Sequence, residues 1–291
     1  MKTLAIAAII AGSTLAAGAA ITAQAATGPA QLRGSDTLFG AVTDAVNQSG
    51  LSTEIQYLGG GSGLGEAGLR AGTQGIAPMS RALSSAAIED LQNQGVTPVQ
   101  NVIGLDGVAV FVKATDASVT HIDIPTLKAI FTCTITDWSG VPGSGKTGPI
   151  AVYRRNDDSG TTDTFKSLVG ITAFGACATP LATTADIAAT TSTDPNAIAY
   201  AGLSAERPEN KALAVAKSAG SPFVAPGIAT IRNFSYPLAR RLYVNSVADG
   251  RTPSASEQAL LDLILDRSFM DPILIANEFV TCPAVADGGC P

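Results

Sequence analysis

The sequence predicts an α/β protein built of two lobes, and three observations lead to this prediction. Short apolar stretches typical of strands alternate with amphipathic stretches typical of helices. The chain has 291 residues, which is more than one typical hydrophobic core needs. Of these residues, 46% are hydrophobic and 14% are charged, as in a well-packed globular protein. We therefore expect two packed units, each with strands covered by helices.

Helix and strand signals alternate in the first part of the chain. A helix is expected within residues 34–50, because Ser35, Asp36 and Thr37 are good N-caps and apolar residues then recur four apart. The next elements are expected in this order: a strand at 53–59, a Gly-rich turn into a helix at 61–72, a strand at 75–80, a helix at 84–95 and a β-rich run at 101–113.

The same alternation continues to the end of the chain. We expect a surface loop and helix in the Ala/Thr-rich residues 178–193. The other expected elements are a helix at 123–131 that begins near Pro125, a strand at 149–155, a helix at 159–170, a strand and turn at 195–203, a β-rich run at 236–245 and an amphipathic helix at 254–266.

Residues 1–25 have the features of a secretory signal peptide. A positive start is followed by an apolar run of small residues and by "AQA" at Ala23–Ala25, a small-x-small cleavage pattern. An uncleaved membrane anchor is the alternative. No cysteine follows the apolar run, so no lipid anchor is signalled. We expect a mature chain in a periplasm or secreted from the cell.

The four cysteines of an exported chain suggest two disulfides. Three pairings are open, and we favour Cys133–Cys177 and Cys282–Cys290, because the last two cysteines lie close together in a Gly-containing tail. A metal site is disfavoured, since there is no CxxC spacing and His121 is the single histidine. We expect no metal and no cofactor.

The charge balance argues against two classes of partner. The formal net charge is −6, from 18 basic and 24 acidic residues. No basic stripe for nucleic acid and no polybasic patch for anionic lipid is present.

Two glycine-rich stretches match nucleotide-binding patterns. Residues 140–147, "GVPGSGKT", fit the P-loop pattern, but "PIAVYRR" follows at once and predicts a strand where a P-loop needs a helix. We therefore expect an exposed connection there, with Lys146 away from any cleft. Residues 63–68, "GLGEAG", fit GxGxxG with a strand before and a helix after, but no acidic residue completes a dinucleotide site.

Three hydroxyl-bearing helix starts point instead to an oxyanion site. Backbone N–H groups at helix N-termini and nearby hydroxyls suit a tetrahedral oxyanion, and a planar guanidinium can bind it through two hydrogen bonds. Arg155 lies four residues before the third start, and Asp157 could hold its guanidinium rigid. Any one of these starts alone would be explained by ordinary N-capping. The three starts are Gly34–Thr37, Gly60–Gly63 and Ser159–Thr161.

With these helix starts the sequence resembles the periplasmic phosphate-binding proteins of ABC phosphate importers, the Pst type. The pieces that carry the resemblance occur in the order of the family and span most of the chain from residue 34 to 244. They are "GSDTL", "YLGGGSGLG", "GIAPMSRAL", "DGVAVFV", "LKAIFTCTITDW", "RRNDDSGTTDTF", "NAIAYAG" and "YPLARRLYV". The most specific piece is "SGT" with an arginine four residues before its serine.

The resemblance implies a two-lobe periplasmic-binding-protein fold of type II, in which each lobe is a mixed sheet flanked by helices and the ligand lies in the cleft. Lobe 1 would be residues 26–106 together with 238–291, and lobe 2 would be residues 107–237. The β-rich runs near 105–112 and 234–243 would cross between the lobes, and Cys133–Cys177 would lie inside lobe 2.

The resemblance also implies a set of ligand-binding residues. Ser35 and Asp157 would support the site, with Asp157 orienting Arg155. At Arg81 some members of the family carry an aspartate that accepts a proton from the ligand, so here we expect a second cationic contact, and the choice among phosphate, sulfate and arsenate stays open. The implied ligand-binding residues are Thr37, Leu38, Ser62, Arg81, Arg155, Ser159, Gly160 and Thr161.

The function implied is capture of inorganic phosphate, or of a similar oxyanion, for uptake by an ABC permease in the inner membrane. The protein would be a monomer and not an enzyme. A secreted hydrolase that uses Ser62 or Ser159 is the main alternative, but His121 would have to be its base, and it lies far from either serine in the sequence. A phosphate sensor or adhesin that reuses the fold is a third hypothesis.

Overall fold

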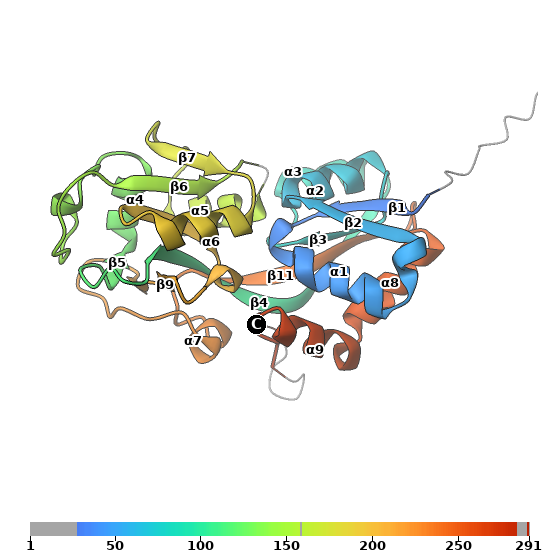
Figure 1. Ribbon diagram of the computed structural model, residues 1–291. Coiled ribbons are helices and arrows are strands. Elements are labelled where there is room, and N and C mark those ends of the chain that lie inside the picture. The colour runs from blue at the N-terminus through green and yellow to red at the C-terminus, as the bar shows by residue number, and fades with distance from the viewer. Residues whose placement is uncertain (1–27, 158, 284–289, 291) are drawn as a thin grey trace, which may run out of the picture.

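The protein has two lobes joined by two long neighbouring strands (Figure 1). The computed structural model describes residues 28–157, 159–283 and 290. The expected signal peptide therefore lies outside the described residues. The largest sheet contains β3 (Ile76–Met79), β11 (Ala239–Ala248), β4 (Thr97–Lys113), β8 (Ala197–Gly202), β6 (Ala151–Arg155) and β7 (Ala178–Leu181) in this spatial order, with β9 (Asn210–Ala212) beside β4.

The lobe that contains the first residues packs helices around a small parallel pair, β1 (Ala30–Gly34) and β2 (Ile55–Gly60). Ser35 caps the short 3-10 helix η1 (Asp36–Leu38), which leads directly into α1 (Phe39–Gln48). The apolar residues four apart are buried as expected, with Leu38 and Val42 at 0% exposure. The other helices of this lobe are α2 (Ser62–Ala71), α3 (Ser85–Asn93), α8 (Ala255–Leu265) and α9 (Arg267–Ala276), with η2 (Leu51–Thr53) before β2.

The other lobe has its own aromatic core. The rings of Phe165 and Tyr200 stack with centroids 3.9 Å apart, and Trp138 is fully buried in the same cluster. The helices of this lobe are α4 (Ile124–Phe131), α5 (Gly160–Val169) and α6 (Thr184–Thr193), with α7 (Ile228–Arg232) near the crossing strands. Its remaining elements are β5 (His121–Asp123) paired with β10 (Ala214–Ala216), and the short helices η3 (Trp138–Gly140) and η4 (Leu203–Ala205).

Strand β4 changes partners halfway along its length. Residues 97–107 pair antiparallel with β11, and residues 108–113 pair with β8 and β9 of the other lobe. We therefore propose that the lobes divide here, at residues 26–106 with 238–291 on one side and 107–237 on the other.

Several elements were not expected from the sequence. Strands β5, β7, β9 and β10 have only three or four residues, too few to show a period of two. Helix α9 contains Pro272, which argues against a helix on local grounds, but its buried face packs on the first lobe. Helix α6 covers the sheet through Ile187, which is 0% exposed, so residues 178–193 are less superficial than expected.

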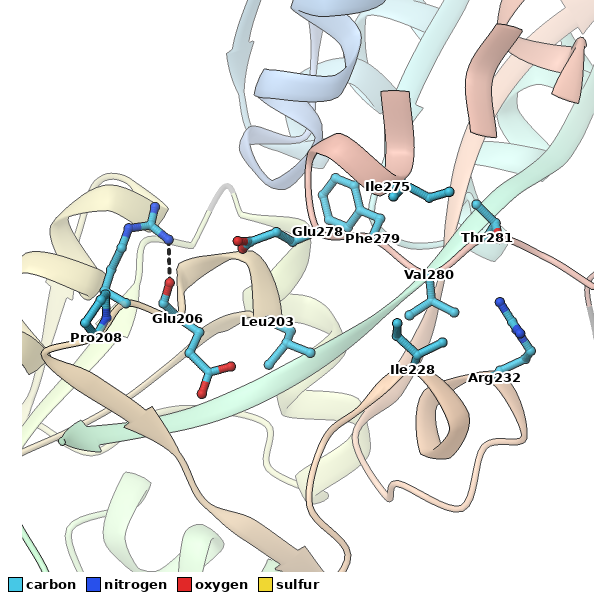
Figure 2. A pocket seen from close by; sticks show the side chains of 11 residues that line it. Leu203, Glu206, Pro208, Ile228, Arg232, Ile275, Glu278, Phe279, Val280 and Thr281 are labelled. Carbon is cyan, nitrogen blue, oxygen red and sulfur yellow. Dashed lines mark hydrogen bonds between the residues drawn. The ribbon is translucent and has the colours of Figure 1, made fainter. Parts of the chain in front are cut away.

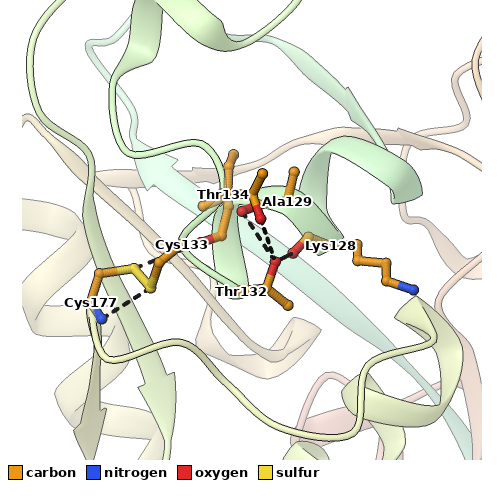
Figure 3. The surroundings of a disulfide bond; sticks show 7 residues. Lys128, Ala129, Thr132, Cys133, Thr134 and Cys177 are labelled. Atoms are coloured by element: carbon orange, nitrogen blue, oxygen red, sulfur yellow. Dashed lines mark hydrogen bonds between the residues drawn. A yellow bond between two sulfur atoms is a disulfide. The ribbon is translucent and has the colours of Figure 1, made fainter.

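Both expected disulfides are present, Cys133–Cys177 and Cys282–Cys290. Cys133 follows the last turn of α4 with a φ of 62°, in the position that glycine usually takes at a helix C-terminus. There its N–H donates to the carbonyl of Ile130, and the N–H of Thr134 donates to that of Ala129. Figure 3 shows how the disulfide joins this helix end to the segment before β7. The bond thus holds a cysteine in a backbone conformation that L-residues seldom adopt.

Removal of Cys133–Cys177 should lower stability more than removal of Cys282–Cys290. The sequence separations are 44 and 8 residues, and chain entropy gives about 4 and about 2.5 kcal/mol for loops of these lengths. Differential scanning calorimetry of the two double Cys→Ala variants measures the difference. Equal losses, or a larger loss for the tail pair, would contradict the ranking.

Candidate functional site

The starts of η1, α2 and α5 carry the hydroxyl residues expected from the sequence. Ser35 Oγ accepts a hydrogen bond from the N–H of Thr37 at 3.2 Å, and Ser159 Oγ accepts one from the N–H of Thr161 at 3.2 Å. Helix α2 begins at Ser62, after three consecutive glycines with positive φ at residues 59–61. Only glycine adopts such a run readily, and it turns the chain sharply from β2 into the helix.

These three helix starts meet at one place, although 124 residues separate the first from the last. Thr37 Oγ1 and Thr161 Oγ1 lie 2.8 Å apart. A methyl group added to Gly160 would lie 2.6 Å from Ser80 Oγ and still closer to Ser62 Oγ. The N-termini of η1 and α2 from one lobe and of α5 from the other therefore converge, and all of these hydroxyl residues are buried.

Ser35 bonds backbone N–H groups that were expected to face a ligand. Its carbonyl accepts from the N–H of Leu38 at 3.1 Å and from the hydroxyl of Tyr57 at 2.8 Å. The N–H groups of Thr37 and Leu38 are thus both bonded to Ser35. What Thr37 presents at the junction is its side-chain hydroxyl.

Arg155 lies at the end of β6 and is completely buried. Its Nη1 donates to Thr184 Oγ1 at 2.8 Å, and its Nη2 donates to Asp36 Oδ2 at 2.7 Å and to the carbonyl of Ala182 at 2.9 Å. Burial lowers the pKa of this guanidinium, and the Asp36 carboxylate opposes the shift. Among the described residues its Nε–H has no hydrogen-bond partner.

The sequence led us to expect Asp157 to hold Arg155, but in the structure Asp157 does not contact Arg155. The carboxylate of Asp157 accepts from Arg154 at 3.0 and 3.1 Å and lies 3.5 Å from Lys166 Nζ. Arg154 and Arg155 leave β6 on opposite faces. The strand ends at Arg155 and Asp157 lies in the turn that follows, so alternation no longer applies to Asp157 and its carboxylate reaches Arg154 on the outer face. The carboxylate that holds Arg155 is Asp36, from the other lobe.

Arg81 is enclosed by two carboxylates. Its Nη1 donates to Glu66 Oε2 at 2.6 Å, and its Nε donates to Asp163 Oδ2 at 2.9 Å. Burial alone would raise the pKa of Glu66, but hydrogen bonds from Arg81 and Ser84 lower it overall. Arg81 therefore links α2 to α5 between the lobes, and its hydrogen bonds within the described residues go to Glu66, Asp163 and the carbonyl of Ala82.

Sequence reasoning missed a buried ion pair at the centre of the molecule. Arg240 Nη2 lies 2.6 Å from Asp106 Oδ2, and both side chains are at most 3% exposed. Arg240 also donates to Thr161 Oγ1 at 3.0 Å and to Thr37 Oγ1 at 3.3 Å. One signal could have found the pair: Asp106 is the single charged residue in the apolar run from residue 102 to 112.

Two adjoining cavities open beside this region. One, of about 930 Å³, reaches Asp36 and Thr37. The other, of about 750 Å³, is lined largely by apolar side chains such as Leu203 and Ile275, with Glu278 near it (Figure 2). Both linings mix charges of the two signs: Glu206, Arg207 and Glu278 belong to each of them.

The glycine-rich motifs have structural roles. Gly65 of the GxGxxG match lies against β1, since a Cβ there would come within 3.1 Å of the Arg33 carbonyl oxygen and of Gly34 Cα. The P-loop match leads into β6, a strand, as expected.

Lys146 of the P-loop match is less exposed than expected. Its side chain is 15% exposed, pairs with Asp116 at 2.7 Å and lies over the Trp138 ring.

Lys146→Ala should leave oxyanion binding unchanged and lower stability at neutral pH. Burial raises the pKa of Asp116, but hydrogen bonds from Lys146 and Ser118 lower it overall. Because the pKa of Asp116 is lower in the folded than in the unfolded chain, the ion pair stabilises the protein at pH values above the unfolded-state pKa. This stabilisation is lost as the pH falls through the folded-state pKa. Thermal melts should therefore differ from wild type at pH 7 and converge in acid. Lys217→Ala is the control, because Lys217 is exposed. Loss of ligand binding in Lys146→Ala would contradict this prediction and support a P-loop at residues 140–147.

Among the described residues the structure contains no group of three potential metal ligands and no helix long and apolar enough to cross a membrane. His121 bonds Thr120 and packs on the Phe223 ring. Neither of these contacts involves Ser62 or Ser159, the serines that a Ser–His hydrolase would use.

Comparison with known proteins assigns the family. The model of a family described as a PBP superfamily domain matches residues 16–267. The chain belongs to the PBP superfamily. One relative of this PBP-superfamily protein is the phosphate-binding protein PstS of Pseudomonas aeruginosa, 26% identical over 267 residues, which are 86% of this chain and 82% of the relative.

Solved structures show that the PBP fold extends over nearly the whole described chain. A phosphate ABC transporter substrate-binding protein from Clostridium perfringens has a TM-score of 0.74 at 22% identity, covering 88% of this chain and all of the other. A phosphate transport receptor from Vibrio cholerae has a TM-score of 0.67 at 21% identity, covering 86% of this chain and 99% of the other.

A second sequence match covers only a short part of the chain. It is a local match to alkaline phosphatase L of P. aeruginosa, 44% identical over 55 residues, which are 19% of this chain and 14% of that protein.

Proposed function

We propose that this protein captures inorganic phosphate, or a similar tetrahedral oxyanion, between its lobes for uptake by an ABC permease. The observation that carries the proposal is the convergence of three hydroxyl-bearing helix starts from two lobes. Helix N-termini carry partial positive charge and favour anions. The names of the relatives, which are phosphate-binding and phosphate-transport proteins, support the same ligand.

The charges at the site fit an anion bound mainly by neutral donors. Arg155 is paired with Asp36, and Arg240 with Asp106, so the four charged side chains sum to zero. Attraction for the anion then comes from hydroxyls, helix ends and the unpartnered Nε–H of the buried Arg155. Such short-range donors work even in a chain whose net charge is −6.

The proposed ligand set is the one expected from the sequence, with three changes. Asp36 replaces Asp157 as the support of Arg155, Arg81 serves to link the lobes, and Leu38 is left out because its N–H is bonded to Ser35. The remaining proposed ligand residues are Thr37, Ser62, Arg155, Ser159, Gly160 and Thr161.

We further propose that the protein acts as a monomer without catalysis, in a periplasm or outside the cell, after cleavage near Ala25. The absence of His121 from the neighbours of Ser62 and Ser159 supports binding without turnover. The His121→Ala variant separates the two functions, because it would silence a Ser–His hydrolase and leave a binding protein intact.

Titration calorimetry of the mature chain should show one site for phosphate. Arsenate, which has the same shape and charge, should compete, and sulfate measured in parallel reports the selectivity. Assays for phosphate release from a phosphate ester should show no turnover. Heat with a sugar or an amino acid but none with phosphate would refute the proposal.

A further inference from the structure

Arg240 and Asp106 face each other across the two strands that join the lobes. They are direct partners in the antiparallel register of β11 and β4. Their side chains are 3% exposed for Arg240 and 1% exposed for Asp106. The pair thus lies beneath the converging helix starts, at the crossing point between the lobes.

The carboxylate of Asp106 is held on all sides. Its Oδ2 accepts from Nε and Nη2 of Arg240 at 3.0 and 2.6 Å, and its Oδ1 accepts from the N–H groups of Gly107 and Leu203 at 2.8 and 3.2 Å. Fixed in this way, Asp106 sets the orientation of the guanidinium plane. Arg240 then has Nη1 and Nη2 directed at the two threonines.

Arg240 determines which way the threonine hydroxyls can point. A guanidinium has no acceptor atom, so Thr161 Oγ1 and Thr37 Oγ1 must both accept from it. Each hydroxyl therefore has to direct its own hydrogen elsewhere. The bond between the two hydroxyls uses one of these hydrogens. The second hydrogen is left to donate to an acceptor.

We propose that Arg240, oriented by Asp106, is a positioning residue of the oxyanion site that makes the hydrogen-bonded hydroxyls of Thr37 and Thr161 a donor pair with one hydrogen directed at the ligand. This inference rests on the proposed function and adds a residue to it. Arg240 touches one hydroxyl from each lobe, so the donor pair is complete only when the lobes are closed. Arg240 donates to both hydroxyls, so only one hydroxyl group separates its positive charge from the ligand atom that accepts the remaining hydrogen.

A purely structural role for the ion pair is the competing explanation, and a double-mutant cycle separates the two. The neutral pair Asp106→Asn with Arg240→Gln avoids leaving a buried charge unpaired. It is made in the wild-type background and in Thr37→Val/Thr161→Val. Phosphate affinity is measured by equilibrium dialysis with radiolabelled inorganic phosphate, and folding by circular dichroism.

The neutral pair should weaken phosphate binding at least tenfold in the wild-type background and less than threefold when both hydroxyls are absent. Arg240→Lys, which keeps one charged donor, should recover part of the loss. If the neutral pair does not fold, Arg240→Lys in both backgrounds gives the same cycle. Equal losses in the two backgrounds, or none in either, would overturn the inference while leaving phosphate binding itself established. A wild-type chain that binds no phosphate would overturn the proposed function and this inference with it.

Discussion

Arg155→Ala is expected to abolish detectable phosphate binding. The guanidinium is fully buried, and its removal would take three donated hydrogen bonds from the closed cleft and leave Asp36 without its cation. Truncating one partner of a buried charge pair costs on the order of 2–5 kcal/mol, which is roughly thirty-fold to several-thousand-fold in affinity. Calorimetry with inorganic phosphate measures the loss.

The neighbouring Arg154→Ala is a matched control for this variant. Arg154 belongs to the same strand but pairs with Asp157, whose side chain is 66% exposed. Its removal should leave phosphate affinity close to wild type. Near wild-type binding by Arg155→Ala would show that the ligand lies elsewhere and that the likeness to phosphate-binding proteins concerns the fold alone.

Gly160→Ala should prevent the lobes from closing and so weaken phosphate binding strongly. The added methyl group would lie 2.6 Å from Ser80 Oγ and 2.7 Å from Ser62 Cβ, so rotation of the serine hydroxyls cannot make room. Overpacking typically costs about 1–3 kcal/mol, or roughly five- to 150-fold in affinity. Only the closed form pays this cost, because the two serines and Gly160 belong to different lobes.

Affinity and X-ray scattering together test this prediction. Phosphate should reduce the radius of gyration of the wild-type chain but not that of Gly160→Ala. Gly145→Ala is the control, since its nearest neighbour would be Ser118 Cβ at 3.8 Å, an ordinary contact. Closure and tight binding by Gly160→Ala would mean that α2 and α5 do not approach each other in the liganded state.

The helix starts could be predicted because their signals are local. Ser35 and Ser159 cap the helices that follow within two residues, so the hydroxyl and the N–H it accepts from are neighbours in the sequence. That these helix starts, distant in the sequence, lie together at one site was implied by the family resemblance. Nothing in the spacing of residues 35–161 would have shown this alone.

The partners of the arginines could not be predicted, because they depend on which face of a strand a side chain takes. Asp157 is two residues from Arg155 in the sequence, yet it pairs with Arg154 on the other face of β6. In β11, Arg240 turns to Asp106, whereas Arg241 lies over the Phe234 ring. A shift of one residue exchanges the two faces, so a pair of adjacent arginines leaves the choice undetermined.

The two joining strands also determine the mechanics of opening. Strands β4 and β11 are hydrogen bonded to each other through residues 97–107 and 239–248, and this ladder ends where the lobes are proposed to divide, so the two connections cross side by side. Two strands paired up to the crossing point cannot slide past each other without breaking the ladder. We therefore expect the cleft to open by bending where the ladder ends, near residues 107 and 239, and not by sliding of one lobe along the other.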